Sequence, residues 1–315
     1  MTKRTESTPR VSVIIATRER PQDLARCLHT VLANDYADFE VLVIDQSTSD
    51  ASEKVALEIA DERLRYWRQR LVGKSRALNW ALAQAQGEII AFTDDDCSVP
   101  PEWLRLGVET LWREPGAGVL FGKLMAAPHE ARELFVPTFS PPRYRRLRGR
   151  RALAIPWMGV GANMFAPREV LDRLSGFDEC LGPGGRFRGG VDMDLAYRAL
   201  RAGFSVVQDP ENTVVHWGER SYADGSARTL LRNNYYGAGA RLVKQIRCGD
   251  LIAGYVLIRN AFGEVVRLAG SLVGQRRGTG AGRLFYLALG AVHGLGQPLD
   301  RRRLLYRPKR TGSAS

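Results

Sequence analysis

Short apolar runs alternate along the first part of the chain with segments whose apolar residues recur every three or four positions. The runs are rich in β-branched residues, a pattern typical of strands buried on both faces, and the periodic segments predict helices with one apolar face. Strands are predicted at Val11–Ala16, Phe39–Ile44, Leu64–Arg68 and Glu88–Thr93, and helices at Pro21–Leu32, Ser52–Asp61 and Ser75–Gln86. Because strands joined by such helices need right-handed crossovers, we expect a Rossmann-like α/β fold with a mostly parallel central sheet flanked by helices.

The pattern becomes mixed after Pro100, where helices and strands alternate with loop-like segments. The Pro- and Arg-rich stretch that ends near Arg151 is interpreted as a mobile loop. The segment Gly182–Gly190 carries five glycines in nine positions, which is typical of a loop that moves or approaches a ligand closely. Further helices are predicted at Glu102–Trp112, Arg168–Leu174 and Asp192–Ala202, and further strands at Gly118–Lys123, Trp157–Phe165, Ser205–Gln208 and Thr213–His216.

After about Ser221 the sequence predicts helices without a clear sheet partner. The apolar stretches Leu251–Ile258, Val265–Val273 and Leu284–Val292 are interrupted by charged residues, and none reaches the roughly 18 apolar residues of a membrane-spanning helix. Two interpretations stay open, because these helices can pack on the catalytic domain or lie on a membrane surface. The predicted organisation is a polar tail (1–10), a catalytic domain (11–220), a helical extension (221–299) and a basic tail (300–315).

Composition adds an expectation about partners. A chain of 315 residues with 44% hydrophobic residues can bury a full core, which excludes the collagen-like and low-complexity classes. The net charge of +12 favours an anionic partner, and much of the excess lies in Arg143–Arg151 and Arg301–Arg310. Either run can equally be a solvated basic loop or tail.

The cysteines are scattered, with no CxxC pair, so neither a zinc site nor a redox motif is indicated. Reduced thiols in the cytosol are the simplest account. The polar segment Met1–Arg10 lacks the apolar stretch of a signal peptide. We therefore expect a cytoplasmic protein, and peripheral attachment at the inner face of the membrane through its basic and amphipathic C-terminal region is one of the two interpretations left open for that region.

Three consecutive carboxylates, Asp94, Asp95 and Asp96, follow the strand that ends at Thr93. Acids gathered at one strand end repel one another, and a bound divalent cation offsets this repulsion better than water does. Mg²⁺ and Mn²⁺ prefer oxygen ligands and often keep substrate phosphates as further ligands. The triplet therefore predicts a metal-bridged diphosphate, with an acidic turn that caps the helix after Pro101 as the alternative.

His216 ends the last predicted strand. It can reach the same carboxyl edge as Asp96 and complete a metal shell, or it can be a structural hydrogen-bonding residue. Asp192 and Asp194 open the helix after the glycine-rich segment, where the helix dipole alone favours carboxylates. Catalysis needs a base aimed at an acceptor hydroxyl, and Asp192 is better placed for this than Asp194, whose spacing suits helix capping or support of the site.

Gly73, Lys74 and Ser75 look like the end of a P-loop, but Arg68 stands where that motif needs glycine, which excludes it. The first strand is not followed by G-x-G-x-x-G, so a dinucleotide cofactor is disfavoured. Lys74 and Arg76 lie near the start of a helix, where cations and free backbone N–H groups together can hold diphosphate oxygens.

Five ordered segments resemble the family 2 glycosyltransferases with the GT-A fold, over about Val11 to Trp217. They begin at Val11 (VSVIIATRER), Val43 (VIDQST), Gly73 (GKSRALN), Thr93 (TDDD) and Gly190 (GVDMDL). The resemblance implies inverting transfer from a nucleotide-diphosphate sugar, UDP- or dTDP-linked, with Mn²⁺ or Mg²⁺. It also implies a carbohydrate, lipid-linked or other hydroxyl acceptor, in the synthesis of cell-surface polysaccharides, glycolipids or other glycoconjugates.

The resemblance also assigns roles to single residues. The positions where the family holds the nucleotide base are Thr17, Arg18 and Asp45. Its D-x-D motif for ribose and metal matches Asp94 and Asp96, with Asp95 between them as a further donor-binding residue. The segment flanking the nucleotide matches Gly73, Arg76 and Asn79; the general base matches Asp192; and the metal-binding histidine matches His216.

Two positions depart from the family pattern: Val191 stands where Glu commonly precedes the catalytic Asp, and Gln46 stands where a second acid is frequent. Three other functions remain as alternatives. A sugar nucleotidyltransferase would show a Gly-rich signature after Ala16, which is not seen. A nucleic-acid-binding protein is suggested by net charge alone and disfavoured because only Tyr144 interleaves the run Arg143–Arg151, so no nucleic acid is expected as a partner. The third is a donor-binding but inactive scaffold.

Overall fold

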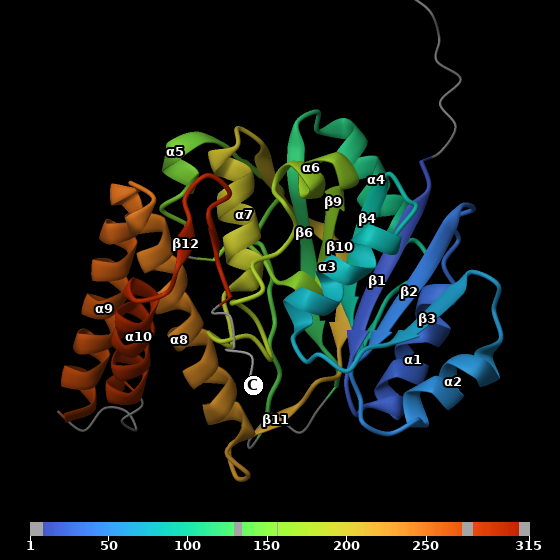
Figure 1. Ribbon diagram of the computed structural model, residues 1–315, viewed down its shortest axis with the longest axis horizontal. Coiled ribbons are helices and arrows are strands. Elements are labelled where there is room, and N and C mark those ends of the chain that lie inside the picture. Colours follow the sequence, from blue (N-terminus) through green and yellow to red (C-terminus); the bar gives the residue numbers. More distant parts are fainter. Residues whose placement is uncertain (1–8, 129–133, 156, 273–279, 309–315) are drawn as a thin grey trace, which may run out of the picture.

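A computed structural model of the protein describes residues 9–128, 134–155, 157–272 and 280–308 (Figure 1). A twisted sheet stands in the centre with helices on both of its faces, and a layer of three long helices lies on one side of the molecule. The predicted α/β class with helices flanking a central sheet is confirmed.

The sheet follows the order β3-β2-β1-β4-β9-β6-β10-β5, and β8 pairs with β10. Its strands are β1 (Val11–Thr17), β2 (Phe39–Asp45), β3 (Leu64–Arg68), β4 (Ile89–Asp94), β5 (Cys97–Ser98), β6 (Ala117–Ala126), β8 (Arg145–Leu147), β9 (Met164–Pro167) and β10 (Ser205–His216). The strands β1 to β4, β6 and β10 run in one direction, while β5, β8 and β9 run against them. The sheet is therefore mostly parallel, and its parallel strands end at one edge.

Alternate residues of the central strands face two separate hydrophobic cores, because successive side chains of a strand point to opposite faces. On β1, Ile14 faces the core beneath α3 (Lys74–Gln84), α6 (Arg168–Arg173) and α7 (Val191–Arg201). Val13 and Ile15 face the core beneath α1 (Pro21–Leu32) and α4 (Trp103–Arg113), with α2 (Ala51–Ile59) beside α1. Burial on both faces explains why these strands read as continuous apolar runs.

Three sequence-based expectations are corrected. The stretch interpreted as a mobile loop contains β8, which pairs with β10, and α5 (Gly149–Ala152); the Arg146 side chain lies 2.6 Å from Glu114. The strand predicted at Trp157–Phe165 begins only at Met164, because the chain turns through a 3₁₀ helix at Gly161–Asn163. The two strands predicted at Ser205–Gln208 and Thr213–His216 are one strand, β10, with an irregularity between them.

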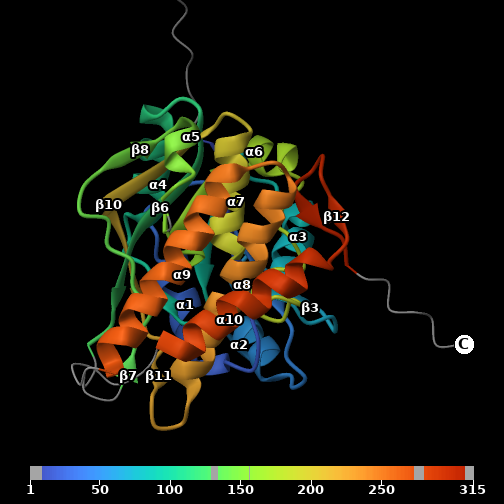
Figure 2. The same cartoon turned by 90° about the vertical axis from the view of Figure 1, so that its left-hand side faces the viewer.

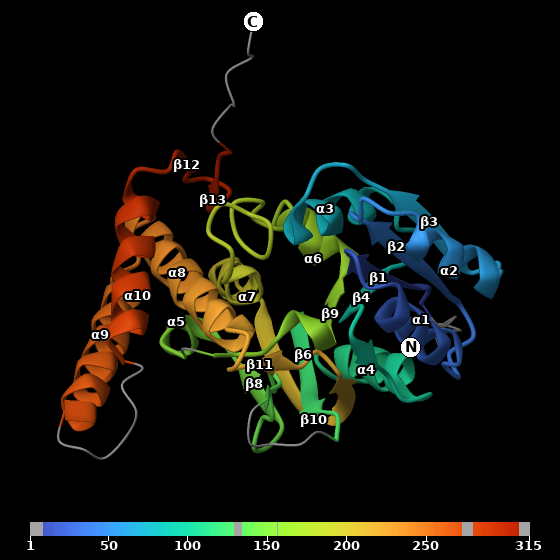
Figure 3. The same ribbon diagram turned by 90° about the horizontal axis from the view of Figure 1, so that it is seen from below.

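The helical layer consists of α8 (Ser226–Arg247), α9 (Leu251–Leu272) and α10 (Gly280–Leu295). Two of the predicted apolar stretches thus belong to the single helix α9, except that Val273 lies outside the described residues. Figure 3 shows α8 between α7 and the outer helices α9 and α10. Within the described part of the chain, no helix combines the length and apolarity needed to cross a bilayer.

Glycines allow α8 to pack closely on both sides. A Cβ atom on Gly237 would lie 2.4 Å from the backbone of Gly189, and one on Gly239 would lie 2.0 Å from the carbonyl oxygen of Leu287 in α10. Any larger residue at these positions would separate the backbones. The contact with Gly189 places the first half of α8, up to Gly237, beside the glycine-rich segment Gly182–Gly190.

A sealed charge cluster, formed by Asp178, Asp194, Arg198 and Lys244, joins α7 to α8. The Lys244 Nζ atom lies 2.6 Å from a carboxylate oxygen of Asp178 and 2.6 Å from one of Asp194, and Arg198 Nε donates to Asp194 over 2.8 Å. Burial opposes ionisation, but the charges of Lys244 and Arg198 hold the pKa of Asp194 below its ordinary value. Asp194 therefore supports the packing of α7 on α8.

The chain after α10 returns to this cluster. A hairpin of β12 (Leu299–Asp300) and β13 (Leu305–Tyr306) follows α10. The backbone N–H of Tyr306 donates to Asp178 over 2.9 Å, and its buried hydroxyl donates to the carbonyl of Ala240 over 2.7 Å. At the other end of the helical layer, β11 (Arg220–Ser221) pairs with β7 (Leu134–Phe135).

Candidate active site

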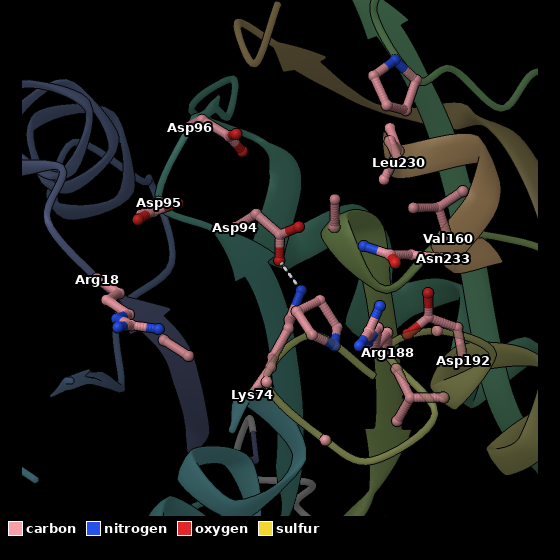
Figure 4. A pocket seen from close by; sticks show the side chains of 18 of the residues that line it. Arg18, Lys74, Asp94, Asp95, Asp96, Val160, Arg188, Asp192, Leu230 and Asn233 are labelled. Carbon is pink, nitrogen blue, oxygen red and sulfur yellow. Dashed lines mark hydrogen bonds and ion pairs between the residues drawn. The ribbon is translucent and has the colours of Figure 1, made fainter. Parts of the chain in front are cut away.

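A cavity of about 750 Å³ lies where the parallel strands end. Its walls come from the ends of β1, β4 and β10, the glycine-rich segment, and the first turns of α7 and α8. Figure 4 shows Asp94, Asp95 and Asp96 on one side of it and Asp192, Arg188 and Asn233 on the other. Ligands of parallel α/β sheets commonly bind at this edge.

The three consecutive carboxylates separate into three different environments (Figure 4). Asp94 forms an ion pair with Lys74. Asp95 accepts a hydrogen bond from the Thr17 hydroxyl over 2.8 Å and one from Arg20 over 3.2 Å. In the described part of the chain, α4 begins at Trp103 without a side-chain cap, so the alternative of an acidic helix cap is not supported.

Asp96 lies among cations. Its carboxylate is 2.8 Å from Arg20 Nη1, 3.2 Å from His216 Nε2 and 3.6 Å from Arg220 Nη2. Burial opposes its ionisation, but the hydrogen bond and charge of His216, with the charges of Arg20 and Arg220, hold the pKa of Asp96 well below its usual range. Burial and the negative charge of Asp96 raise the pKa of Asp95 to about 6.

Asp96 and His216 can supply an oxygen ligand and a nitrogen ligand to one metal ion. The Nδ1 atom of His216 lies 2.9 Å from the carbonyl oxygen of Pro137, to which it can donate a hydrogen bond that leaves Nε2 free to coordinate. One ligand atom each of Asp96, Cys97 and His216 lie within 4.8 Å of one another. Because burial raises the pKa of the Cys97 thiol well above its ordinary value, Cys97 is a poor ligand there.

The backbone at Gly218 passes directly over this pair. A Cβ atom at that position would lie 2.3 Å from Asp96 Oδ2 and 2.6 Å from His216 Nε2. The oxygen and nitrogen donors suit Mn²⁺ or Mg²⁺ with phosphate oxygens as further ligands. The site therefore fits the predicted metal.

Asp192 is the second residue of α7, and the helix is preceded by Gly190, which adopts a left-handed conformation with φ 83°. Its carboxylate accepts a hydrogen bond from the backbone N–H of Gly161 and faces the cavity (Figure 4). Burial raises the pKa of Asp192, and the positive charge of Lys74 opposes that rise. A carboxylate held in this way is a suitable proton acceptor.

Thr17, Arg18, Gly73 and Lys74 line the cavity, but three other predicted donor-binding residues do not. Asp45 is buried and accepts hydrogen bonds from the hydroxyls of Ser47 and Tyr66, each at 2.5 Å. The Asn79 amide donates to the carbonyl of Phe177 over 3.0 Å, and Arg76 lies 3.4 Å from Glu179. These contacts join α3 to the segment 177–179, and direct contact of Asp45, Arg76 or Asn79 with a donor stays a prediction.

Several cavity residues were not identified from the sequence: Arg20, Trp157, Arg188, Arg220, Leu230, Asn233 and Asn234. Arg20 was detectable, since it follows the first strand within the quoted motif VSVIIATRER. Leu230, Asn233 and Asn234 carry no sequence signal, because they reach the cavity through the packing of α8 on the glycine-rich segment. Gln46, which replaces a frequent acid, accepts from the backbone N–H of Gly73 over 2.9 Å and so positions the start of α3.

Comparison with known families and curated proteins gives a consistent result. The profile of Glycosyl transferase family 2 matches residues 12–175. Glycosyltransferase AglE of Haloferax volcanii is 26% identical over 208 residues, a match that covers 64% of this chain and 65% of AglE. The match thus spans less than two thirds of that relative's length.

Solved structures share the fold. The mannosyltransferase PcManGT from Pyrobaculum calidifontis, in complex with GDP-Man and Mn²⁺, superposes with a TM-score of 0.63 at 20% identity over 92% of this chain and 88% of its own. S. aureus TarS 1–349 in complex with UDP-GlcNAc superposes with a TM-score of 0.57 at 18% identity, over 74% of this chain and 66% of its own. These likenesses establish the GT-A-like architecture.

Proposed function

Because the chain belongs to glycosyl transferase family 2, we propose that it transfers a sugar from a nucleotide-diphosphate sugar to an acceptor hydroxyl and inverts the anomeric carbon. One observation carries the proposal: the pair Asp96–His216 and the carboxylate of Asp192 border the same cavity from different elements of the fold. A leaving diphosphate and an acceptor hydroxyl can thus be held in one space.

The donor diphosphate is proposed to lie between the strand ends and α3. Asp96 and His216 would hold Mn²⁺ or Mg²⁺, with Asp94 as a further ligand, and such an ion supplies positive charge to the leaving diphosphate. Lys74 lies at the start of α3, where its ammonium group can bind phosphate oxygens. Thr17 and Arg18 are proposed to contact the nucleotide, and Asp95 holds Thr17 in place through a 2.8 Å hydrogen bond.

Asp192 is proposed as the general base. It removes the proton of the acceptor hydroxyl, whose oxygen attacks the anomeric carbon while the bond from that carbon to the diphosphate oxygen breaks. The electron pair of that bond leaves with the nucleoside diphosphate. A free nucleoside diphosphate as product, rather than pyrophosphate, separates this reaction from nucleotidyl transfer.

The acceptor is proposed to be a carbohydrate, lipid-linked or other hydroxyl compound used in polysaccharide, glycolipid or other glycoconjugate synthesis. The cavity is also lined by Val191, which stands where the family commonly has Glu, and by Arg188 and Asn233. We place the reaction in the cytoplasm, at the inner face of a membrane.

The direct test is a panel of nucleotide sugars, UDP- and dTDP-linked sugars and GDP-mannose among them, screened for Mn²⁺-dependent rises in melting temperature. A matching donor stabilises the folded protein by mass action. Calorimetry then compares the variant Asp96→Ala with the control Asp50→Ala, since Asp50 is exposed and does not line the cavity. We expect metal-dependent binding to be lost only in Asp96→Ala. A protein that ignores every donor with either metal would overturn the proposal.

A further inference from the structure

The outer face of the helical layer exposes large apolar side chains in a regular pattern. On α9 they recur every three or four residues and are between 47% and 82% exposed. At 100° per residue they fall on one side of the helix. They are Leu251, Tyr255, Ile258, Phe262, Val265 and Val266.

The neighbouring helix α10 adds Phe285, Val292 and Leu295, whose exposed fractions lie between 58% and 62%. We call these nine side chains the outer apolar face; Figure 2 shows the helices that carry it turned toward the viewer. Scattered single exposed residues are ordinary on soluble proteins, but a group of this size on two neighbouring helices marks an interaction surface.

The charge around this face has one sign. Residues 221–315 contain 16 Lys and Arg against four Asp and Glu, while residues 1–220 contain 30 of each, so the C-terminal part accounts for the whole net charge of +12. The two acids that lie between 226 and 295, Asp250 and Glu264, are both buried. The described surface of the helical layer over that span therefore presents no carboxylate to a partner.

We infer that the outer apolar face docks on an anionic lipid bilayer, with α9 and α10 lying along its surface. Apolar and aromatic side chains enter the boundary between headgroups and acyl chains, while arginines beside them attract anionic headgroups. Arg259 flanks the face on α9, where its guanidinium lies over the Tyr255 ring, while Arg267, 58% exposed, pairs with Glu264 over 2.9 Å and Arg283 lies over Tyr235 of α8. A second copy of the chain fits less well, since it would bring two surfaces of the same charge together.

Docking in this orientation would fix where the bilayer lies relative to the cavity of the proposed reaction. Helix α8 lines the cavity with Leu230, Asn233 and Asn234 and packs against α9 and α10 on its other side (Figure 3). The bilayer would thus lie on the side of the molecule next to α8, separated from the cavity by α8 and by the layer of α9 and α10, and a lipid-linked acceptor would approach from that side. That consequence rests on the proposed glycosyl transfer, whereas the docking itself does not.

Vesicle sedimentation tests the docking with the full-length protein. We expect the protein to sediment with vesicles of phosphatidylcholine that contain about a quarter phosphatidylglycerol, more weakly with pure phosphatidylcholine, and more weakly again as salt is raised. Replacing Ile258 or Phe262 with Asp should lower the partition coefficient about tenfold or more.

The matched control is Leu57→Asp on α2. Leu57 is 72% exposed and Ile258 is 71% exposed, but the helix α2 lies at the opposite side of the molecule from α9 (Figure 1). We expect Leu57→Asp to sediment as the unchanged protein does, and circular dichroism confirms that each variant is folded.

Three outcomes would overturn the inference: no sedimentation with anionic vesicles, equal loss in Leu57→Asp and Ile258→Asp, or a dimer in light scattering that Ile258→Asp dissolves. Donor binding by calorimetry is measured in parallel on the same variants. A protein that binds vesicles but no donor refutes the proposed transfer alone, and one that binds donor but no vesicles refutes the docking alone.

Discussion

On helix α7, Asp192 and Asp194 stand two residues apart and belong to two different groups of charged side chains. Asp194 is part of the sealed charge cluster, whose side chains are no more than 1% exposed and are held by ion pairs of 2.6 to 2.8 Å. Asp192 faces a cavity of about 750 Å³ that also borders Lys74 and Asp96. The side-chain types are the same in both groups, so burial and opposite charge do not by themselves identify a reactive site.

The difference lies in the space beside the charges. In the sealed charge cluster every carboxylate is matched by a protein cation, and the side chains are no more than 1% exposed. Around the cavity the carboxylates also face cations, but phosphate oxygens or an acceptor can enter between them. The two groups should therefore respond in opposite ways to substitution, the first in stability and the second in activity.

The largest expected effect concerns the base. Asp192→Asn keeps the shape of the side chain but removes proton acceptance, so the transfer rate should fall by about 10² to 10⁴. Initial rates with saturating donor and acceptor measure this, and calorimetry should show donor binding retained. A rate near that of the unchanged enzyme would exclude Asp192 as the base.

The sealed charge cluster should show the reverse. Lys244→Met leaves Asp178 and Asp194 without their shared cation, and breaking a buried pair in this way costs about 3–5 kcal/mol of folding free energy. Urea denaturation measures the loss, and donor binding of the folded fraction should persist. The control Lys54→Met removes only a surface ion pair, with side chains 66% and 60% exposed, and should leave the denaturation curve unchanged. Equal stability of the two variants would contradict the comparison.

A smaller effect follows from the support of Asp192. A Cβ atom on Gly161 would lie 2.5 Å from Asp192 Oδ1, so Gly161→Ala should displace the carboxylate. We expect the rate to fall by about tenfold to a hundredfold while donor affinity stays the same. Gly254→Ala is the control, since nothing lies within 4 Å of a Cβ atom there. If both variants keep full activity, the position of Asp192 is not critical.

The smallest effect is a shift in pH dependence. Burial raises the pKa of Asp192 and the charge of Lys74 opposes the rise, so the transfer rate should fall as the pH drops through this raised pKa. Lys74→Met removes the opposing charge, and the acid limb of the rate profile, measured at saturating donor, should move to higher pH. A limb that moves to lower pH would contradict the contact, and Lys54→Met should leave the profile in place.

The same raised pKa has a consequence for stability of opposite sign. Because the folded protein holds the proton of Asp192 more tightly than the unfolded chain does, Asp192 lowers stability as the pH rises from the ordinary pKa to the raised one. Asp192→Asn should remove this part of the pH dependence in urea denaturation.

The sequence allowed the central strands to be predicted because each is a continuous apolar run buried on both faces, as in β1, β2 and β4. It did not reveal β8, a strand of three residues in an Arg- and Pro-rich stretch whose partner β10 begins 58 positions later, at Ser205. Pairing across that separation depends on tertiary structure, which local pattern does not report.

For the candidate site too, residues at strand ends could be predicted from the sequence, and residues brought in by helix packing could not. Asp96 and His216 could be expected to meet, because both follow strands that end at one edge of a parallel sheet, and the distance of 3.2 Å between them agrees with this reasoning. Asn233 and Leu230 could not be expected there, since they reach the cavity only because Gly237 lets α8 approach Gly189. The roles of the site residues that the sequence did predict stay predictions.

The hairpin after α10 has a consequence for how the molecule comes apart. Tyr306 is bound to Asp178 and Ala240, residues 128 and 66 positions earlier in the chain, so the last described strand is tied both to the segment between α6 and α7 and to α8. If the helical layer unfolded alone, Lys244 would leave with it, and the carboxylates of Asp178 and Asp194 would lose the cation that they share. The helices and the sheet are therefore expected to unfold in one concerted transition, and a protein cut after residue 220 would lose much more than a surface appendage.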